Sequence, residues 1–332
     1  SVSLATLDRP SADIQGRLGL DYVGVPDRAA GDPGPLAVAP GGRRVLLLAG
    51  VHEVCTSPSG VLYVDRLTVG LGPSAVAVDA EGRLAWITNR FSDTVSVVRI
   101  NPLARLAEIP LGPTPGLTAA DRGEQLFHDA RLSSDGWFSC HSCHPRGHTN
   151  NLLNDNFGDD AYGAPRKVLS LLGSGDTGPW AWNGSVSRLT GQVHKSVTTT
   201  LRGTALTDRQ ASDLAEYLRR LPPPPSIATA RGTLDAEAVG RGRVIFDRAG
   251  CATCHAPPSY TSARTFDVGL DDELGRRRFN PPSLRGISQR HGYFHDNRAR
   301  DLRELLVRFR HGLETPLPRP EVDDLVRFLE SL

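Results

Sequence analysis

The sequence carries the pentapeptide CHSCH at residues 140–144 and the pentapeptide CATCH at residues 251–255. In each pentapeptide, two cysteine thiols three positions apart can add to the vinyl groups of one porphyrin, and the histidine that follows can bind its iron. The pattern therefore predicts two covalently bound c-type haems. The expected attachment and axial residues are Cys140, Cys143 and His144 for the first haem and Cys251, Cys254 and His255 for the second.

A structural zinc site is the alternative to haem, because paired cysteines and histidines also bind a tetrahedral metal. One zinc ion would require the two pentapeptides to converge on it. Each pentapeptide instead has its own trailing histidine and its own helical surroundings. Two complete signatures in one chain therefore favour haem over zinc.

Composition and cofactor together limit the location and the partners of the protein. Covalent haem attachment takes place outside the cytoplasm, so we expect a periplasmic or other extracytoplasmic protein. The sequence opens at Ser1 without a charged and apolar leader, which fits a signal peptide already removed. No apolar run of about 18 residues predicts a membrane span. The net charge of +1 argues against a nucleic acid as partner.

Lysine is rare in this chain, because Lys167 and Lys195 are the only two and arginine carries nearly all of the positive charge. A lysine axial ligand is therefore not expected. A ring of lysines that docks a redox partner is not expected either.

The region around the two pentapeptides is an internal duplication. GEQLF at 123–127 precedes the first pentapeptide as GRVIF at 242–246 precedes the second, and the pattern of 213–221 recurs at 324–332. Apolar residues at helical spacing predict one helix before and one after each pentapeptide, which is the frame of a small cytochrome c domain. Four prolines at 222–225 cannot be helical and predict a stiff spacer.

Residues 1–115 differ in kind, because apolar residues alternate with polar ones between turn signals. Segments 74–79, 84–89 and 94–100 predict successive strands. Gly-Pro pairs recur about every 40 residues, close to the roughly 40–45-residue period of a propeller blade. The letters WITN at 86–89 begin a stretch that resembles the YVTN type of β-propeller repeat.

This resemblance covers one blade well and a second, at 35–70, loosely. Two blades cannot close a propeller, which needs about four or more. We therefore expect a fragment, or a second polypeptide that completes the propeller; a two-layer β cap on the haem domains is the alternative. The predicted fold class is multidomain, with two mainly α cytochrome c domains in tandem after an all-β segment that resembles part of a β-propeller. The expected domains are 1–115 for the blades, 116–225 for the first cytochrome c domain with its Pro-rich linker, and 226–332 for the second.

The fifth cysteine, Cys55, has no partner in the chain, because the other four are committed to haem. In an exported protein an odd cysteine suggests an intermolecular disulfide or a free thiol. A buried, inert thiol among the strands is the alternative interpretation.

From about residue 117 onward the sequence resembles the bacterial dihaem cytochrome c peroxidases and their MauG-type relatives. GEQLFHDARLSSDG at 123–136 is similar to the opening motif of that family, and YFHDN at 293–297 is similar to its Tyr-Phe-His-Asp-Gly. The resemblance implies that one haem reacts with peroxide and the other stores or relays electrons. Trp182 matches the tryptophan between the two haems, with an aromatic wedge as the alternative role. Gln192 matches a supporting glutamine.

The chain departs from this family at the axial and distal positions, which set the chemistry of a haem. It has no methionine, so the axial Met of the peroxidases is absent, and Phe309 stands where MauG has its axial tyrosine. His311 is therefore a candidate second axial ligand, with an exposed histidine at a helix C-terminus as the alternative. No carboxylate occurs in 193–202, where the distal glutamate of the family would fall.

His194 and His148 are the candidates that replace this distal glutamate, either as proton-exchanging groups or as second axial ligands. An ordinary hydrogen-bonded histidine is the alternative for each. The resemblance also implies a calcium ion between the haem domains, although Gly163 stands at the position of the asparagine ligand. A solvated acidic loop is the alternative to calcium. The nearby oxygen ligands are Asn154, Asp155, Asp159 and Asp160.

These observations together predict an exported dihaem oxidoreductase of the peroxidase and MauG type, with a redox partner protein or a small electron donor. In this interpretation the Cys140 haem meets peroxide or another oxidant, and the Cys251 haem exchanges electrons through Trp182. The alternative is a non-catalytic dihaem electron-transfer subunit of a larger assembly, with both irons closed by protein ligands.

Overall fold

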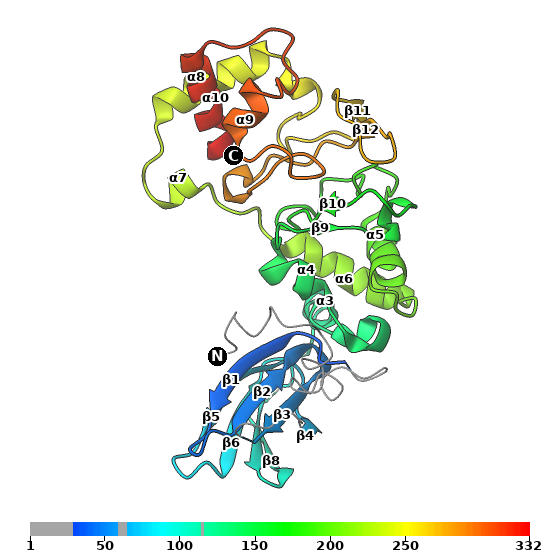
Figure 1. Cartoon of the computed structure of the whole chain (residues 1–332), viewed down its shortest axis with the longest axis vertical. Coiled ribbons are helices and arrows are strands. Elements are labelled where there is room, and N and C mark those ends of the chain that lie inside the picture. Colours follow the sequence, from blue (N-terminus) through cyan, green and yellow to red (C-terminus); the bar gives the residue numbers. More distant parts are fainter. Residues whose placement is uncertain (1–28, 59–64, 114–115) are drawn as a thin grey trace, which may run out of the picture. The chain divides into compact units, whose positions relative to one another are not determined.

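The computed structural model describes residues 29–58, 65–113 and 116–332 (Figure 1). These residues form two compact units. The first unit holds the described residues up to Thr118 together with Glu124–Ser142 and Leu201–Thr204. The second unit holds Ala119–Gly123, Cys143–Thr200 and Ala205–Leu332. The three predicted domain ranges divide the chain differently and stay predictions.

The first unit contains two four-stranded antiparallel sheets, in each of which the strands pair in sequence order. In β6 the residues Ala85 and Ile87 are buried and Trp86 and Thr88 are exposed, as alternation predicts for a strand with one covered face. The prediction of an all-β segment is confirmed. One sheet consists of β1 (Pro33–Val38), β2 (Arg44–Leu48), β3 (Glu53–Ser57) and β4 (Asp65–Thr68), and the other of β5 (Pro73–Val78), β6 (Leu84–Asn89), β7 (Thr94–Ile100) and β8 (Leu103–Pro110).

Both sheets contribute to one apolar core, in which Val45 and Val54 of the first sheet join Ile87 and Val98 of the second. Cys55 lies on β3 and is buried. Burial raises the pKa of its thiol to about 11, so the thiol stays protonated and unreactive near neutral pH. This geometry supports the buried, inert thiol over an intermolecular disulfide.

The remainder of the chain is mainly helical, and helices flank both pentapeptides as the duplication predicts. No helix among the described residues is long and apolar enough to cross a membrane. Residues 222–225 lie outside any helix, as four prolines require. The helices are α3 (Ala119–Phe127), α4 (Cys140–Cys143), α5 (Leu189–Lys195), α6 (Asp208–Arg220), α7 (Ile227–Ala230), α8 (Ala236–Arg248), α9 (Leu302–Val307) and α10 (Arg319–Ser331). Two short strand pairs accompany them, β9 (Leu153–Asn154) with β10 (Arg166–Lys167) and β11 (Phe266–Asp267) with β12 (Arg278–Phe279).

The two copies share a close helix crossing at a glycine. A Cβ atom placed on Gly123 of α3 would lie 2.0 Å from the carbonyl oxygen of Asp213 on α6. A Cβ atom on Gly242 of α8 would lie 2.1 Å from the carbonyl oxygen of Asp324 on α10. Because no real Cβ fits at such a distance, glycine is required where each pair of helices meets.

An arginine beside each glycine completes the same crossing. Arg122 donates from two nitrogens to both carboxylate oxygens of Asp213, at 2.7 and 2.8 Å. Arg241 forms the equivalent pair with Asp324, at 2.7 and 2.9 Å. These hydrogen bonds lower the pKa of both carboxyl groups, so both pairs are ionised at neutral pH. The internal duplication therefore extends to individual contacts.

Replacing the crossing glycine tests this arrangement. Gly242→Ala should destabilise the protein by about 1–3 kcal/mol, because the new methyl group overpacks against the Asp324 carbonyl. Gly240→Ala on the same helix is the matched control, because its Cβ would meet nothing within 4 Å. Denaturant unfolding of the haem-bearing protein should show a lower midpoint for Gly242→Ala alone. Equal midpoints for the two variants would show that the crossing is not tight.

Candidate haem sites

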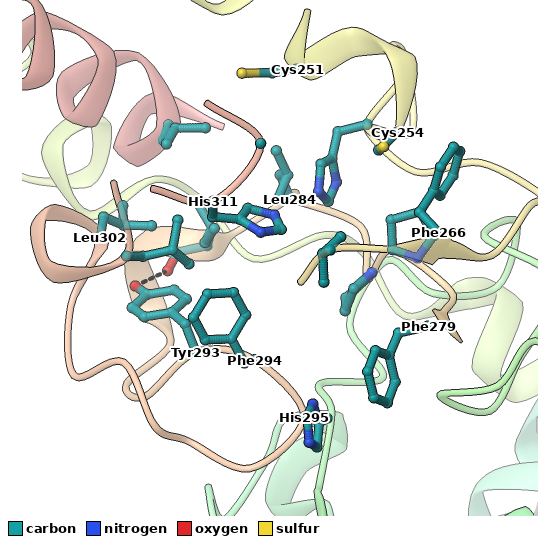
Figure 2. Close-up of a pocket in the computed structure, with 18 of the residues that line it drawn as sticks. Cys251, Cys254, Phe266, Phe279, Leu284, Tyr293, Phe294, His295, Leu302 and His311 are labelled. Carbon is teal, nitrogen blue, oxygen red and sulfur yellow. Dashed lines mark hydrogen bonds between the residues drawn. The ribbon is translucent and has the colours of Figure 1, made fainter. Parts of the chain in front are cut away.

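A cavity of about 250 Å³ lies beside the second pentapeptide. Helix α8 ends at Arg248, and Gly250 with a φ of 73° turns the chain into a short 3-10 helix at Cys251–Thr253. This turn places Cys251, Cys254 and His255 in the cavity wall (Figure 2). Most of the remaining wall is apolar, with leucines from α9 and α10. Such a cavity suits a porphyrin with two thiols at its edge.

The imidazole of His255 is held in the orientation that metal binding needs. Its Nδ1 lies 3.1 Å from the carbonyl oxygen of Tyr260. A carbonyl oxygen only accepts, so Nδ1 carries the proton and the lone pair of Nε2 is left for iron. Burial lowers the pKa of His255 to about 4, so the ring is neutral near neutral pH, and neutral imidazole is the ligating form.

His311 faces His255 across this cavity. The two ring centroids are 6.4 Å apart. Two imidazoles on opposite sides of one metal, with metal–nitrogen bonds of about 2 Å, would have centroids roughly 6 Å apart. Nδ1 of His311 is buried and has no hydrogen-bond partner among the described residues, and burial lowers the pKa of this ring. The residues present therefore fit a haem between two histidines.

A sharp turn brings His311 into the cavity wall. Helix α9 ends at Val307, and Arg310 has a φ of 48°, which reverses the chain before the histidine. The backbone N–H of His311 donates to the carbonyl of Leu305 at 3.2 Å. Phe309, at the position of the MauG tyrosine, packs edge-on against Phe294, with ring centroids 5.3 Å apart.

In the first pentapeptide, the axial histidine is also held by a hydrogen bond to a backbone carbonyl. The cysteines are on the one-turn helix α4, and Nδ1 of His144 lies 3.2 Å from the carbonyl oxygen of His148. Burial lowers the pKa of His144 to about 4, so this imidazole is also neutral. The side-chain amide of Asn154 lies 3.6 Å from the sulfur of Cys143. Both proximal histidines are thus oriented by a backbone carbonyl.

The first unit holds the start of this pentapeptide through one carboxylate. The hydroxyl of the fully buried Ser139 donates to Asp32 at 2.5 Å, and the hydroxyl of Ser142 donates to the other oxygen of Asp32. These serines flank Cys140. The β region therefore fixes the backbone at the first thiol, a contact that no sequence pattern indicated.

The predicted distal residues occupy different surroundings. Nδ1 of His148 lies 2.7 Å from the hydroxyl of Ser170, so this ring is engaged in the protein. Gln192 and His194 are both on α5, and two positions apart they do not face the same side of a helix. The carbonyl oxygen of the Gln192 side chain is buried and lacks a partner among the described residues. The distal assignment stays a prediction.

Trp182 lies in the wall of the second cavity. Its indole N–H donates to the carbonyl of Lys167 at 2.9 Å, and its ring meets His295 edge-on, with centroids 6.4 Å apart. The indole is therefore fixed next to the second haem site. Lys167 and Arg290 also line this cavity and were not among the predicted site residues.

The acidic loop predicted as a calcium site is engaged with cations of the protein. Asp159 accepts from Arg276 at 2.7 Å and pairs with Arg166 at 3.0 Å. Asp160 pairs with Lys195 at 3.1 Å. The described residues contain no group of three or more histidines, cysteines or carboxylates that could hold a metal ion. The calcium prediction therefore gains no support from this geometry.

Sequence comparison relates this arrangement to known proteins. The family model described as di-haem cytochrome c peroxidase matches residues 118–226. The methylamine utilization protein MauG of Methylorubrum extorquens is 27% identical over 350 residues, which covers 86% of this chain and 94% of that protein. The hydrazine synthase subunit gamma of Kuenenia stuttgartiensis is 27% identical over 274 residues, which covers 63% of this chain and 76% of that subunit.

Comparison of structures shows the same fold. A chain of Kuenenia stuttgartiensis hydrazine synthase superimposes with a TM-score of 0.57 at 24% identity, over 68% of this chain and 98% of that chain. The similarity thus includes both the sequence and the fold. The haem region of this chain is therefore similar to the dihaem cytochrome c peroxidases and the MauG proteins.

Proposed function

We propose that the chain is a peroxidase-like or MauG-like dihaem oxidoreductase, in which the Cys140 haem reacts with peroxide or another oxidant and the Cys251 haem relays electrons. The facing of His255 and His311 across one cavity carries this proposal. A site with an imidazole on each side has no open position for an oxidant and suits electron transfer. Oxidant chemistry is then left to the first haem.

The residues around the haems have separate roles in this proposal. When bound, the two haems supply one electron each, and reduction of hydrogen peroxide to two waters takes up two electrons and two protons. His144 and His255 are the neutral proximal ligands, oriented by backbone carbonyls. In this proposal Gln192, whose side-chain carbonyl oxygen is buried without a partner among the described residues, and His194 are the distal groups of the first haem.

Trp182 is the proposed relay between the haems. Its hydrogen bond to Lys167 fixes the indole in the wall of the second cavity, where it cannot reorient. An indole can be oxidised by one electron and can therefore act as a relay in that wall. The donor is then a redox partner protein or a small reductant, in the periplasm or another extracytoplasmic location. The two sheets of the first unit are the surface that a second polypeptide with further blades would extend.

The spin state of the second haem tests the role of His311. In His311→Ala, the Cys251 haem should change from six-coordinate low-spin to high-spin, because one axial ligand is lost. In His311→Met it should stay low-spin and gain a higher potential, because Met/His ligation raises the potential of haem iron. Low-temperature electron paramagnetic resonance and spectroelectrochemistry measure both effects. His291→Ala, at an exposed side chain, is the control. An unchanged low-spin signal in His311→Ala would contradict ligation by His311.

Peroxide reactivity tests the enzymatic part of the proposal. The half-reduced protein should consume hydrogen peroxide with oxidation of the Cys251 haem, and Trp182→Phe should slow this oxidation about tenfold or more while both haems stay attached. Stopped-flow absorption spectroscopy follows the reaction. The proposal of peroxidase activity is contradicted if the ferric and half-reduced proteins show only low-spin haem and do not react with peroxide.

A non-catalytic electron-transfer subunit is the second candidate function. It is favoured by the similarity to a protein named as a subunit, the hydrazine synthase subunit gamma, and by the lack of a carboxylate in 193–202. Under this alternative both haems are low-spin, and His194→Ala converts the first haem to high-spin. Under the peroxidase proposal the first haem is high-spin before any substitution.

A further inference from the structure

Two cations lie in the wall of the second cavity, Lys167, which is buried, and Arg290, which is half-buried with a buried Nε atom. Lys167 is 5% exposed, and its ammonium group donates to the backbone carbonyls of His291, at 2.6 Å, and of Gly292. An ammonium group has three N–H donors, so one of them is not used by these contacts. Burial, with the charge of Arg290 nearby, lowers the pKa of Lys167 to about 8.

Arg290 is the second cation. Its two terminal nitrogens donate to the carbonyls of Ser283 and Arg285, each at 2.7 Å. Its Nε is buried and has no partner among the described residues. Burial lowers the pKa of Arg290 to about 10, which leaves the group charged at neutral pH. Lys167 therefore keeps one unused N–H donor and Arg290 keeps at least its Nε donor, and the charge of each cation is not paired within the described residues.

No carboxylate among the described residues pairs with these charges. None of the residues that line the cavity is an aspartate or a glutamate. Neither Lys167 nor Arg290 forms an ion pair with another described residue, and the cation that lowers the pKa of Lys167 is Arg290 itself. Two like charges buried together without a counter-charge are unfavourable, so the folded protein requires an anionic group at this place.

We propose that Lys167 and Arg290 bind the two propionate carboxylates of the haem attached at Cys251 and Cys254. The two propionates of a c-type haem carry two negative charges, which equals the number of lysine and arginine side chains in the cavity wall. Its propionates project from the edge of the porphyrin opposite to the vinyl groups that the cysteines take. Ammonium and guanidinium groups are the donors that bind carboxylates most strongly.

The position of Lys167 agrees with this orientation of the porphyrin, in which the propionates point away from the cysteines. The ammonium nitrogen of Lys167 lies 5.8 Å from the ring centroid of Tyr293, and the hydroxyl of Tyr293 donates to the carbonyl of Arg290 at 3.1 Å. Figure 2 shows Tyr293 on the side of the cavity away from Cys251 and Cys254. The ammonium group of Lys167 therefore lies at the end of the cavity where the propionates are expected. This inference rests on haem attachment at the second pentapeptide and is independent of peroxidase activity.

The binding of the propionates has an electrostatic consequence. Reduction adds an electron to the haem, and a positive charge nearby favours the reduced form. Lys167→Gln removes the charge but keeps an N–H donor for the carbonyls of His291 and Gly292. At a fixed potential it should shift the oxidised-to-reduced ratio of the Cys251 haem about tenfold towards oxidised, which is about 59 mV for one electron. Lys167→Arg should restore the ratio.

The experiment combines this potential with the infrared spectrum of the propionates. Protein that carries haem labelled with ¹³C at the propionate carboxylates is titrated by spectroelectrochemistry, with covalent haem content checked by mass spectrometry. We expect Lys167→Gln to lower the potential of the Cys251 haem and to shift a labelled carboxylate band, and Arg290→Gln to shift the other band. Lys195→Gln, which removes the other lysine charge of the chain, should do neither.

Two results would overturn the assignment of Lys167 and Arg290 to the propionates. Haem-bearing Lys167→Gln with the potential and the carboxylate bands of the unsubstituted protein would overturn the proposal, and so would an equal shift in Lys195→Gln. If Lys167→Gln fails to fold, Arg290→Gln and Lys167→Arg carry the same test through their infrared bands. Loss of peroxide turnover without these changes would concern the proposed function and would leave the propionate assignment standing.

Discussion

Each haem-binding half depends on one contact, the crossing of two helices at a glycine that lies against a backbone carbonyl. A glycine lets the two helix axes approach more closely than any side chain would, and the arginine–aspartate pair beside it resists separation. Helix α8 continues directly into Cys251, and Leu325 and Leu329 of α10 line the cavity. The crossing therefore determines where the thiols lie relative to the opposite wall.

The same frame gives both proximal histidines the same support, so the difference between the two haems must come from the residues opposite them. In the second half, the positive φ of Arg310 directs His311 towards His255. A phenylalanine two residues earlier fills the space against Phe294. One turn therefore places an imidazole opposite His255 without altering the helices. This is how a duplicated frame can hold two haems of different chemistry.

Local pattern predicted the parts of the structure that repeat along the chain. Strands β6 and β7 have the predicted bounds, and the helices around both pentapeptides lie where apolar spacing placed them. The contacts between distant residues carried no such signal. Asp32 meets Ser139, 107 positions later, and nothing periodic marks either residue. The scarcity of lysine indicated that a lysine would not ligate iron, but it did not reveal that Lys167 is buried at the haem. Only the folded chain shows that two cations share one cavity without a carboxylate.

In the proposed second site, the two buried cations and the two axial imidazoles act on the potential of the haem in opposite directions. An axial pair of imidazoles gives a lower potential than the Met/His pair of the peroxidases, so the haem yields its electron more easily. Two buried cations would raise the potential, because they favour the reduced form in a medium of low dielectric constant. Paired with two propionates, however, they form a nearly neutral set, and the imidazoles then dominate. A low-potential haem next to Trp182 can pass its electron towards a more oxidising first haem. The loss of methionine from this chain is in this way consistent with a relay, because the direction of electron flow depends on the difference between the two potentials.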